Sequence, residues 1–252
     1  MTIQSSALTD PGCVRADNED RVLADAGAGL YVVCDGMGGA QRGDVAAEIA
    51  IETIRHFIAA TGERCDVTWP FGYKHDLSVS ANRLLTAIRL ANHQVWRRAE
   101  QALEYAGMGS TVAALLLDET HATAANIGDS RVYRLRGGSL RQLTTDDTLI
   151  ADLLARGIVS PEASYRHPMR NVLTQAAGAK ETIDVHLWEE ALAPGDVFLL
   201  SSDGLHKTVA EEEIRRALSA ATPLEARASR LIEAARLADV HDNISAVVVA
   251  CD

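Results

Sequence analysis

The stretch TVAALLLDETHATAANIGDSRVYRLRGGSLRQL, residues 111–143, decides the fold. Its first two apolar runs, TVAALLL and HATAANI, are separated by a short polar turn, and each has the length of a strand. Further on, RVYRLR and SLRQL flank Gly137-Gly138, which is the signal of a tight hairpin. Because strand follows strand without a helix between them, the sequence predicts antiparallel sheets and not a doubly wound parallel sheet.

Helical patterns lie on both sides of these strands. Apolar residues recur at helical spacing over 46–57 and over 84–103, and each pattern gives one buried stripe. Two further helices are predicted by the spacing of capping boxes: Thr208 with Glu211, and Thr222 with Glu225. The loosest stretch is 61–76, which we expect to be a long connection inside one domain. The fold class is therefore α+β, with long helices covering antiparallel sheets.

Composition excludes several classes of function. The chain has 252 residues, 47% apolar and 23% charged, and its net charge of −11 repels nucleic acid and anionic membranes. No apolar stretch reaches the length of a membrane span, and MTIQSSALTD at the N-terminus has no basic or apolar region of a secretory signal. Cys13, Cys34, Cys65 and Cys251 have neither metal-binding nor disulfide spacing. We therefore expect a cytoplasmic protein with reduced thiols and no nucleic-acid or membrane partner.

Aspartates stand where the apolar strands end or begin. In LYVVCDGMGG (30–39) a strand ends on Asp35, and in VFLLSSDGLH a strand is followed by Asp203. Asp129 lies between two strands, and Asp242 comes directly before ISAVVVA. An Asp-Gly pair by itself is most simply a turn. The recurrence at four strand ends is what suggests a shared site.

The motif RADNED (15–20) adds further acidic residues, among them Asp17, before another short strand. If the strand ends share one edge of the core, several carboxylates meet there and cannot all stay ionised without a counter-charge. Few lysines or arginines adjoin them in the sequence, so a bound cation is the simplest counter-charge. Hard oxygen ligands without a zinc-type His/Cys set indicate magnesium or manganese. Because His206 and His241 adjoin two of the aspartates, a mixed site stays open.

The glycines after Asp35 allow a turn, a phosphate cradle or an exposed carbonyl. Gly36 leaves its backbone carbonyl approachable, so that a metal could bind this oxygen as well. The run GMGGAQRGD has no lysine after its glycines and does not fit the phosphate-binding loop of nucleotide-binding proteins. A nucleotide cradle is therefore the poorer explanation.

Six motifs occur in a fixed order: RADNED, DGMGG, GSTVAALLL, GDSRVYRL, SSDGL and DNIS. In this order the chain resembles the metal-dependent protein Ser/Thr phosphatases of the PPM family, protein phosphatase 2C type, in its bacterial branch. The resemblance implies a single catalytic domain over residues 1–252 and a monomer. It also implies a four-layer α-β-β-α sandwich, in which two antiparallel sheets pack face to face with helices on both outer sides.

The resemblance implies roles for the acidic residues. Asp35 would bridge two Mn²⁺ or Mg²⁺ ions, the Gly36 carbonyl would bind one of them, and Asp203 and Asp242 would bind the other. The remaining roles implied are a weaker third metal site at Asp129 with Asp203, and water-mediated metal contacts from Glu19 and Asp20. A hydroxide bridging the two ions would attack phosphorus in line, without a phosphoenzyme.

Arg15 matches the arginine that grips the substrate phosphate in the family. It would form a bidentate, charge-assisted pair with two phosphate oxygens and neutralise charge in the transition state. The predicted function is therefore a protein serine/threonine phosphatase acting on phosphorylated Ser/Thr proteins. Its expected partner is a Hanks-type Ser/Thr kinase or the substrates of such a kinase.

The chain departs from the family pattern beside the flap. The segment 147–170 resembles the mobile flap next to the active site, with Asp147 where relatives often have histidine and Gln175 where arginine is usual. Met37 replaces the histidine proposed as general acid in some relatives. Two alternatives stay open: a pseudophosphatase that binds phosphoproteins without cleaving them, and a phosphatase dedicated to an anti-sigma-factor antagonist. The retained acidic residues argue against the pseudophosphatase.

Overall fold

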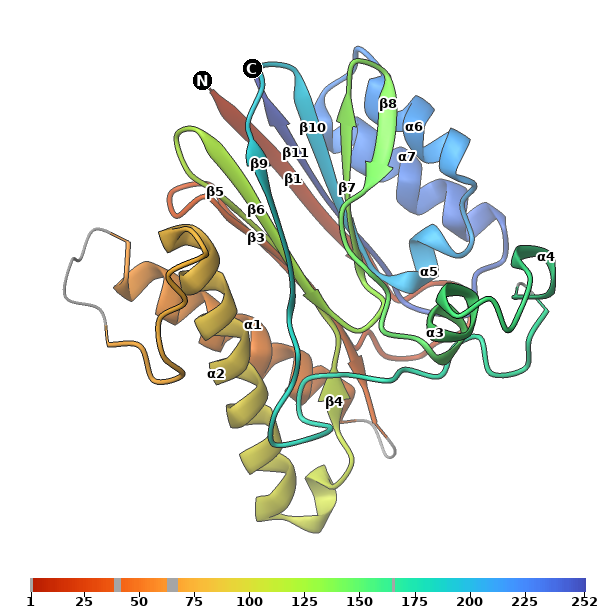
Figure 1. The fold of residues 1–252 in the computed structure, drawn as a ribbon. Helices are drawn as coiled ribbons and strands as arrows, with labels where there is room; N and C mark the ends of the chain where they lie inside the picture. Colours follow the sequence, from red (N-terminus) through yellow and green to blue (C-terminus); the bar gives the residue numbers. More distant parts are fainter. Residues whose placement is uncertain (1, 39–41, 63–67, 165) are drawn as a thin grey trace.

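The computed structural model describes residues 2–38, 42–62, 68–164 and 166–252. Two antiparallel sheets form its centre (Figure 1). The five-stranded sheet contains, in spatial order, β1 (Ile3–Asp10), β11 (Ile244–Cys251), β10 (Asp196–Ser201), β7 (Arg131–Arg136) and β8 (Ser139–Gln142). The six-stranded sheet contains β2 (Asp20–Asp25), β3 (Leu30–Met37), β5 (Val112–Leu117), β6 (His121–Ile127) and β9 (His186–Ala191), and β4 (Gly109–Ser110) pairs with β3.

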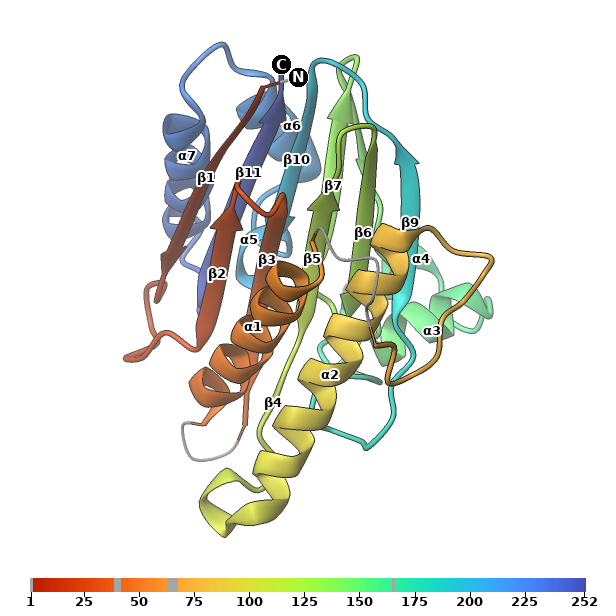
Figure 2. The same cartoon turned by 90° about the vertical axis from the view of Figure 1, so that its left-hand side faces the viewer.

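Helices cover the outer face of each sheet (Figure 2). The six-stranded sheet is covered by α1 (Gly43–Ala60) and α2 (Val79–Gln101), and the five-stranded sheet by α6 (Glu211–Ser219) and α7 (Leu224–Leu237). The shorter helices are η1 (Leu103–Tyr105), α3 (Leu149–Ala155), α4 (Pro161–Ser164) and α5 (Asp203–His206). The predicted α+β class and the four-layer sandwich are confirmed.

Three apolar layers separate these four layers of secondary structure. One lies between α1, α2 and the six-stranded sheet, one between the two sheets, and one between the five-stranded sheet and α6, α7. Successive side chains of a strand point to opposite faces and so pack in two different apolar layers. In β10, Leu199 packs toward the helices, and Phe198 and Leu200 pack between the sheets. Each strand therefore contributes to two of the three layers.

Several local predictions are confirmed, and two are wrong. The hairpin at Gly137-Gly138 and the helix over 46–57 are present, and α2 covers the predicted helix over 84–103 as far as Gln101. Leu103 lies beyond it in η1 and is 95% exposed, so the predicted buried stripe ends earlier. The helices after Thr208 and Thr222 exist, but neither begins with a capping box, because Ala210 and Pro223 are the N-cap residues and no side chain caps them. Each capping motif has the spacing of a capping box, but its threonine stands one or two residues before the N-cap position of the helix.

The strands β1, β4 and β9 were not predicted from the sequence. β1 and β9 lie at sheet edges and expose part of their length, so their apolar pattern is weak. Of the predicted connection 61–76, the described residues form no helix or strand, and 63–67 with Cys65 lie outside the described residues. Cys13, Cys34 and Cys251 are free thiols. Among the described helices, none is both long and apolar enough to cross a membrane.

Candidate metal centre

The alternation of β3 determines where Asp35 points. Val32 and Cys34 pack toward α1 and α2, whereas Tyr31 and Val33 pack between the two sheets. Because successive side chains of a strand point to opposite faces, Asp35 continues the face of Tyr31 and Val33. A carboxylate therefore stands at the end of the apolar layer between the sheets.

Gly36 lies on the opposite face of β3, where α1 begins. A Cβ atom on Gly36 would lie 2.1 Å from the carbonyl oxygen of Gly43, the first residue of α1. The Gly36 N–H donates to the carbonyl oxygen of Glu19 at 3.3 Å. Only glycine allows this close approach of strand and helix, which gives the first glycine of DGMGG a packing role.

Asp20 is the direct cross-strand partner of Asp35. The register of β2 and β3 pairs the two residues, so their side chains lie on the same face of the sheet. Asp20 is only 1% exposed, and its Oδ2 accepts hydrogen bonds from the hydroxyls of Ser202 and Ser245, both at 2.7 Å. Ser245 lies in β11 of the other sheet and Ser202 directly follows β10, so Asp20 links the two sheets. Its Oδ1 is buried without a hydrogen-bond partner among the described residues.

Asp203 and Asp242 come together at the ends of neighbouring strands. Asp203 follows β10, and Asp242 precedes β11. A Cβ atom on Gly204 would lie 2.1 Å from the carbonyl oxygen of Asn243 and 3.5 Å from the Cβ of Asp242. The absence of a side chain at Gly204 therefore lets the two turns touch, and this contact places Asp203 beside Asp242.

Asn243 holds the RADNED loop against this end of the molecule. Its Oδ1 accepts the N–H of Glu19 at 2.9 Å, and its Nδ2 donates to the carbonyl oxygens of Pro11 and Asp17, both at 3.0 Å. The loop carries Arg15, whose Nη2 lies 3.1 Å from Asp242 Oδ1. Both side chains of this ion pair are about half exposed. The predicted phosphate-binding arginine therefore lies at the exposed side of the carboxylates.

Glu19 has a structural contact that the sequence did not predict. Its Oε1 accepts the N–H of Gly43 at 3.1 Å, so the carboxylate lies at the positive end of α1. Burial raises the pKa of Glu19, while the bond from Gly43 and the charge of Arg15 oppose this rise. Glu19 thus caps α1, and its predicted water-mediated contact with a metal stays a prediction.

Asp129 is paired with a lysine. It is 4% exposed in the turn between β6 and β7, and its Oδ2 lies 2.7 Å from the Lys207 ammonium. The same ammonium lies 2.8 Å from Asp203 Oδ2, one helical turn earlier in the chain. The expectation that few cationic side chains adjoin these aspartates is therefore wrong, because α5 turns Lys207 toward Asp203 and the fold brings Asp129 to both.

Asp35 has acidic neighbours and, in the part of the chain that the structure describes, no such cation. Burial raises the pKa of Asp35 well above its usual value, and the charges of Asp20, Asp203, Asp129 and Asp242 raise it further. Its N–H and carbonyl are hydrogen-bonded, but its carboxylate accepts no hydrogen bond from the described residues. Burial likewise raises the pKa of Asp20 to about 7, against the two serine bonds. A proton or a cation must stabilise this pair.

The chemistry of these donors fits a hard divalent cation. They are carboxylates and one backbone carbonyl, and the Oδ1 of Asp20 lacks a partner. In the described part of the chain, no three acidic, histidine or cysteine side chains converge closely enough to hold one ion by themselves. Asp203 and Asp242 face Lys207 and Arg15, so an ion beside Asp35 would keep waters as further ligands or draw these carboxylates away from their partners.

The neighbouring histidines do not join this group. His206 is buried, and its Nδ1 forms a hydrogen bond with the hydroxyl of Ser201 at 3.0 Å. Burial, helped by Arg131 and Lys207, lowers the pKa of His206 well below its usual value. His241 is exposed and lies 3.9 Å from Asp239. The mixed Asp/His site that the sequence left open therefore finds no support in these contacts.

The flap-like segment 147–170 contains α3 and α4 and lies beside α5 (Figure 1). A cavity of about 600 Å³ separates it from α5 and α6, with Leu154 on one side and Lys207 on the other. At the start of the segment, Asp147 accepts hydrogen bonds from Gln175 Nε2 at 3.1 Å and from His186 Nε2 at 2.8 Å. The two departures from the family pattern, Asp147 and Gln175, thus contact each other.

Known proteins resemble this chain in sequence and in fold. The sequence profile described as protein phosphatase 2C matches residues 12–243. The chain belongs to the protein phosphatase 2C family. It is 37% identical over 248 residues to the serine/threonine protein phosphatase PstP of Mycobacterium tuberculosis, which covers 98% of this chain and 45% of PstP. It is 32% identical over 255 residues to the protein phosphatase PhpP of Streptococcus pneumoniae, covering 98% of this chain and 97% of PhpP.

Solved structures of the family have the same fold. The crystal structure of PstP from M. tuberculosis matches with a TM-score of 0.87 and 33% identity over all of both chains. The structure of the PstP catalytic domain in complex with two manganese ions matches with a TM-score of 0.84 and 32% identity over 99% of both chains. The predicted family and fold are confirmed, while this chain spans less than half the length of PstP.

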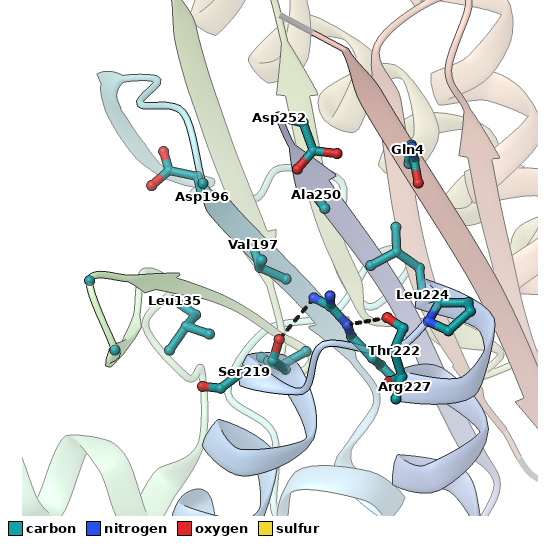
Figure 3. Close-up of a pocket in the computed structure, with 15 residues that line it drawn as sticks. Gln4, Leu135, Asp196, Val197, Ser219, Thr222, Leu224, Arg227, Ala250 and Asp252 are labelled. Carbon is teal, nitrogen blue, oxygen red and sulfur yellow. Dashed lines mark hydrogen bonds between the residues drawn. The ribbon is translucent and has the colours of Figure 1, made fainter.

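A second hollow lies at the opposite end of the sandwich (Figure 3). Its volume is about 430 Å³, and Asp196 and Val197 at the start of β10 line it, whereas Asp203 lies past the end of that strand. Arg227 donates to the carbonyl oxygens of Thr222 and Leu218, both at 2.9 Å. This guanidinium therefore holds the connection between α6 and α7, and the hollow is separate from the acidic centre.

Four residues of the centre escaped the sequence analysis. Asn243 and Ser245 lie in DNIS, and Ser202 lies in SSDGL, so the motifs marked their place without giving their contacts. Lys207 stands four residues after Asp203, a spacing that would have predicted an ion pair if a helix had been expected there. The four-residue spacing of Asp203 and Lys207 is visible in the sequence, but it indicates an ion pair only within a helix, and helix α5 was not predicted.

Proposed function

We propose that this chain is a metal-dependent protein serine/threonine phosphatase that uses two Mn²⁺ or Mg²⁺ ions. PstP and PhpP carry the name of protein phosphatase, and the PstP catalytic domain binds two manganese ions. The observation that carries the proposal is the Asp20–Asp35 pair. It joins two neighbouring carboxylates that are surrounded by acidic residues, and one of their oxygens is buried without a partner among the described residues.

The proposed ligands are Asp35, the Gly36 carbonyl, Asp203 and Asp242. Two divalent ions bound there would polarise a phosphate ester and make a water acidic enough to attack phosphorus near neutral pH. The charge of the centre supports this number of ions. The predicted acidic site residues are Glu19, Asp20, Asp35, Asp129, Asp203 and Asp242, and their cationic contacts are Arg15 and Lys207. The surplus of four negative charges equals the charge of two divalent ions.

Arg15 is proposed to bind the substrate phosphate. Its guanidinium is half exposed and is held beside Asp242 by the RADNED loop, so it lies where a substrate would enter from solvent. A guanidinium presents paired donors that match two phosphate oxygens. When Asp242 turns toward an ion, Arg15 loses its partner and becomes free to bind phosphate.

Asp20 and Glu19 are proposed to hold waters rather than ions directly. Oδ2 of Asp20 is committed to Ser202 and Ser245, which leaves Oδ1 to accept a hydrogen bond from a water. Oε1 of Glu19 is committed to α1, and Oε2 remains for the same purpose. Asp129 is not included in the two-ion ligand set, because Lys207 already contacts its carboxylate.

We also propose that residues 1–252 act as one catalytic domain. The support is the pairing of the first strand with the last, which runs in register from Ile3 opposite Cys251 to Asp10 opposite Ile244. The proposed substrates are proteins phosphorylated on serine or threonine, including a Hanks-type kinase or its targets. The cytoplasmic location and the monomeric state stay predictions from the sequence.

The test is a metal titration of phosphate release. The metal-stripped chain is given a phosphothreonine peptide, and turnover is expected only as manganese is added and to stop with EDTA. The same peptide carrying phosphotyrosine is the control for substrate class and is expected to react much more slowly. Turnover that persists in EDTA would contradict the two-ion mechanism. Binding of the peptide without phosphate release would favour the pseudophosphatase.

A further inference from the structure

Lys207 fills the space between Asp129 and Asp203. Its Nζ lies 2.7 Å from Asp129 Oδ2, 2.8 Å from Asp203 Oδ2 and 3.3 Å from the side-chain oxygen of Asn171. A lysine ammonium has three N–H donors, and these three oxygens use all of them. Asp129, Asp203 and Asn171 therefore form a cation site that is already occupied by the ammonium group of Lys207.

The backbone and the core hold Lys207 in this place. Its N–H donates to the carbonyl oxygen of Asp203 at 2.9 Å, which closes one helical turn and puts both side chains on one face. The flanking residues Leu205, His206 and Val209 are buried, so the short helix cannot turn without exposing them. The side chains of Asp129 and Asp203 are only 5% and 19% exposed, so these two carboxylates have little room to move away from Lys207.

The ammonium stays charged at neutral pH. Its two carboxylate partners lie at 2.7 and 2.8 Å, and opposite charges at this distance favour the protonated form of a lysine. The pair of carboxylates consequently has a permanent positive partner. The nearby Asp20–Asp35 pair has no such partner among the described residues.

A third divalent ion does not fit while Lys207 is present. Mg²⁺ binds oxygens at about 2.0–2.1 Å. An ion at that distance from both Asp129 Oδ2 and Asp203 Oδ2 would occupy the space of the Lys207 nitrogen, which lies 2.7 and 2.8 Å from the same atoms. The two cations would also repel each other at contact distance. The residues therefore disagree with the third metal site predicted from the family resemblance.

We infer that Lys207 replaces the third ion, so that this chain binds two divalent ions and supplies the third cation from its own sequence. The inference rests on the proposed function and specifies its metal content. Asn171 follows the flap-like segment directly, so the bond from Lys207 also ties the end of that segment to α5. A lysine keeps this contact at every metal concentration, whereas an exchangeable ion would release it when metal is scarce.

The experiment counts bound manganese per chain. Metal-stripped protein is titrated with manganese, and bound ions are counted by calorimetry and by loss of the electron paramagnetic resonance signal of free Mn²⁺. We expect two ions for the wild-type chain and three for Lys207→Ala, which frees Asp129 and Asp203. Lys207→Arg keeps the charge and is expected to bind two. Lys180→Ala removes an exposed lysine elsewhere and is expected to leave the number at two.

A double variant locates the third ion. Lys207→Ala combined with Asp129→Asn is expected to return from three ions to two, because it removes the carboxylate that the lysine had occupied. If Lys207→Ala does not fold without metal, Lys207→Ser is prepared in manganese and counted in the same way, with three ions expected. Circular dichroism of each variant checks that the fold is retained.

The outcomes separate this inference from the proposed function. Three ions in the wild-type chain, or two ions in folded Lys207→Ala and Lys207→Ser, would overturn the role of Lys207 and leave the two-ion phosphatase intact. Fewer than two ions in the wild-type chain would overturn the proposed metal centre, and the inference would fall with it.

Discussion

Strand β10 has a buried aspartate at its start and a partly buried one just past its end, and the two are neutralised differently. At the start, Asp196 is fully buried, and Arg136 donates to its two carboxylate oxygens at 2.6 Å each. Past the end, Asp203 shares the single ammonium of Lys207 with Asp129, and Asp35 nearby has no cation among the described residues. Arg136 also contacts Glu190, which pairs with Arg134, so two acids face two arginines and this group is balanced. Where carboxylates outnumber cationic side chains, a bound cation or a proton is needed to balance the negative charge.

The comparison explains why we propose metal binding at the acidic end and not at the other end. The hollow beside Asp196 is larger than a water molecule, but Arg227, the cation that lines it, is already committed to backbone carbonyls. At the acidic end, negative charge remains after the cationic contacts of the described residues, those of Arg15 and Lys207, have been counted. Unbalanced charge, and not the presence of a hollow, distinguishes the candidate site.

The strongest test of this contrast removes one acid from each end. Asp35→Asn is expected to lower manganese-dependent turnover on the order of 10³-fold, because it removes the carboxylate that we propose holds the ions. Asp196→Asn is the matched control: it is expected to lower the melting temperature and keep kcat near the wild-type value while the protein is folded. Phosphate release from a phosphothreonine peptide measures both. Equal loss of kcat in the two variants would remove the distinction between the ends.

A pH titration of the metal-free protein tests the excess of acid by itself. Since the fold raises the pKa of Asp20 from 3.8 to about 7, its stabilising effect is present below the unfolded value and is lost as the pH rises through 7. The free energy of unfolding is expected to fall by roughly 3 kcal/mol between pH 5 and pH 8 through this group. Chemical denaturation at a series of pH values measures the fall.

Manganese and Asp20→Asn are the controls for this pH dependence. The ion supplies the missing charge and is expected to flatten the curve, whereas the asparagine is expected to remove only the part of the fall that is due to Asp20, since the pKa of Asp35 is raised as well. A metal-free protein as stable at pH 8 as at pH 5 would show that the carboxylates are balanced without an ion.

A smaller effect is expected at the exposed side of the acidic end. Arg15→Ala is expected to raise KM for the phosphopeptide roughly 10- to 100-fold with a lesser change in kcat, because hydrogen bonds between charged groups contribute about 1.5–3 kcal/mol. Arg236→Ala, which removes an equally exposed arginine paired with Asp10, is the control and is expected to leave KM unchanged. Steady-state kinetics separate the two parameters. An unchanged KM in Arg15→Ala would exclude it from the phosphate site.

The smallest effect is expected at the opposite end. Arg227→Ala removes the bonds to Thr222 and Leu218 and is expected to lower stability by about 1 kcal/mol, since each exposed hydrogen bond contributes little. Neither kcat nor KM should change. Thermal denaturation and the same kinetic assay check both statements, and a kinetic defect here would connect the hollow in Figure 3 with the active end.

Much of the fold could be predicted because its signals are local. Apolar runs marked β5, β6 and β10, the hairpin signal at Gly137-Gly138 marked β7 and β8, and helical spacing marked α1 and α2. The edge strands β1 and β9 could not be found in this way, since their long-range partners, β11 and β6, stabilise them more than their own apolar pattern does. Helix starts were placed wrongly at α6 and α7, where capping spacing occurs without capping contacts.

The sequence by itself determined which acids stand at strand ends, because a strand sends alternate residues to the same face wherever it is placed in the molecule. Only the tertiary structure decided which of these acids obtain a counter-charge. The pairing of Asp20 with Asp35 depends on the register of two strands, and the approach of Lys207 to Asp129 joins residues that are 78 positions apart. Charge balance is a property of all neighbours in space, and for this reason it could not be read along the chain.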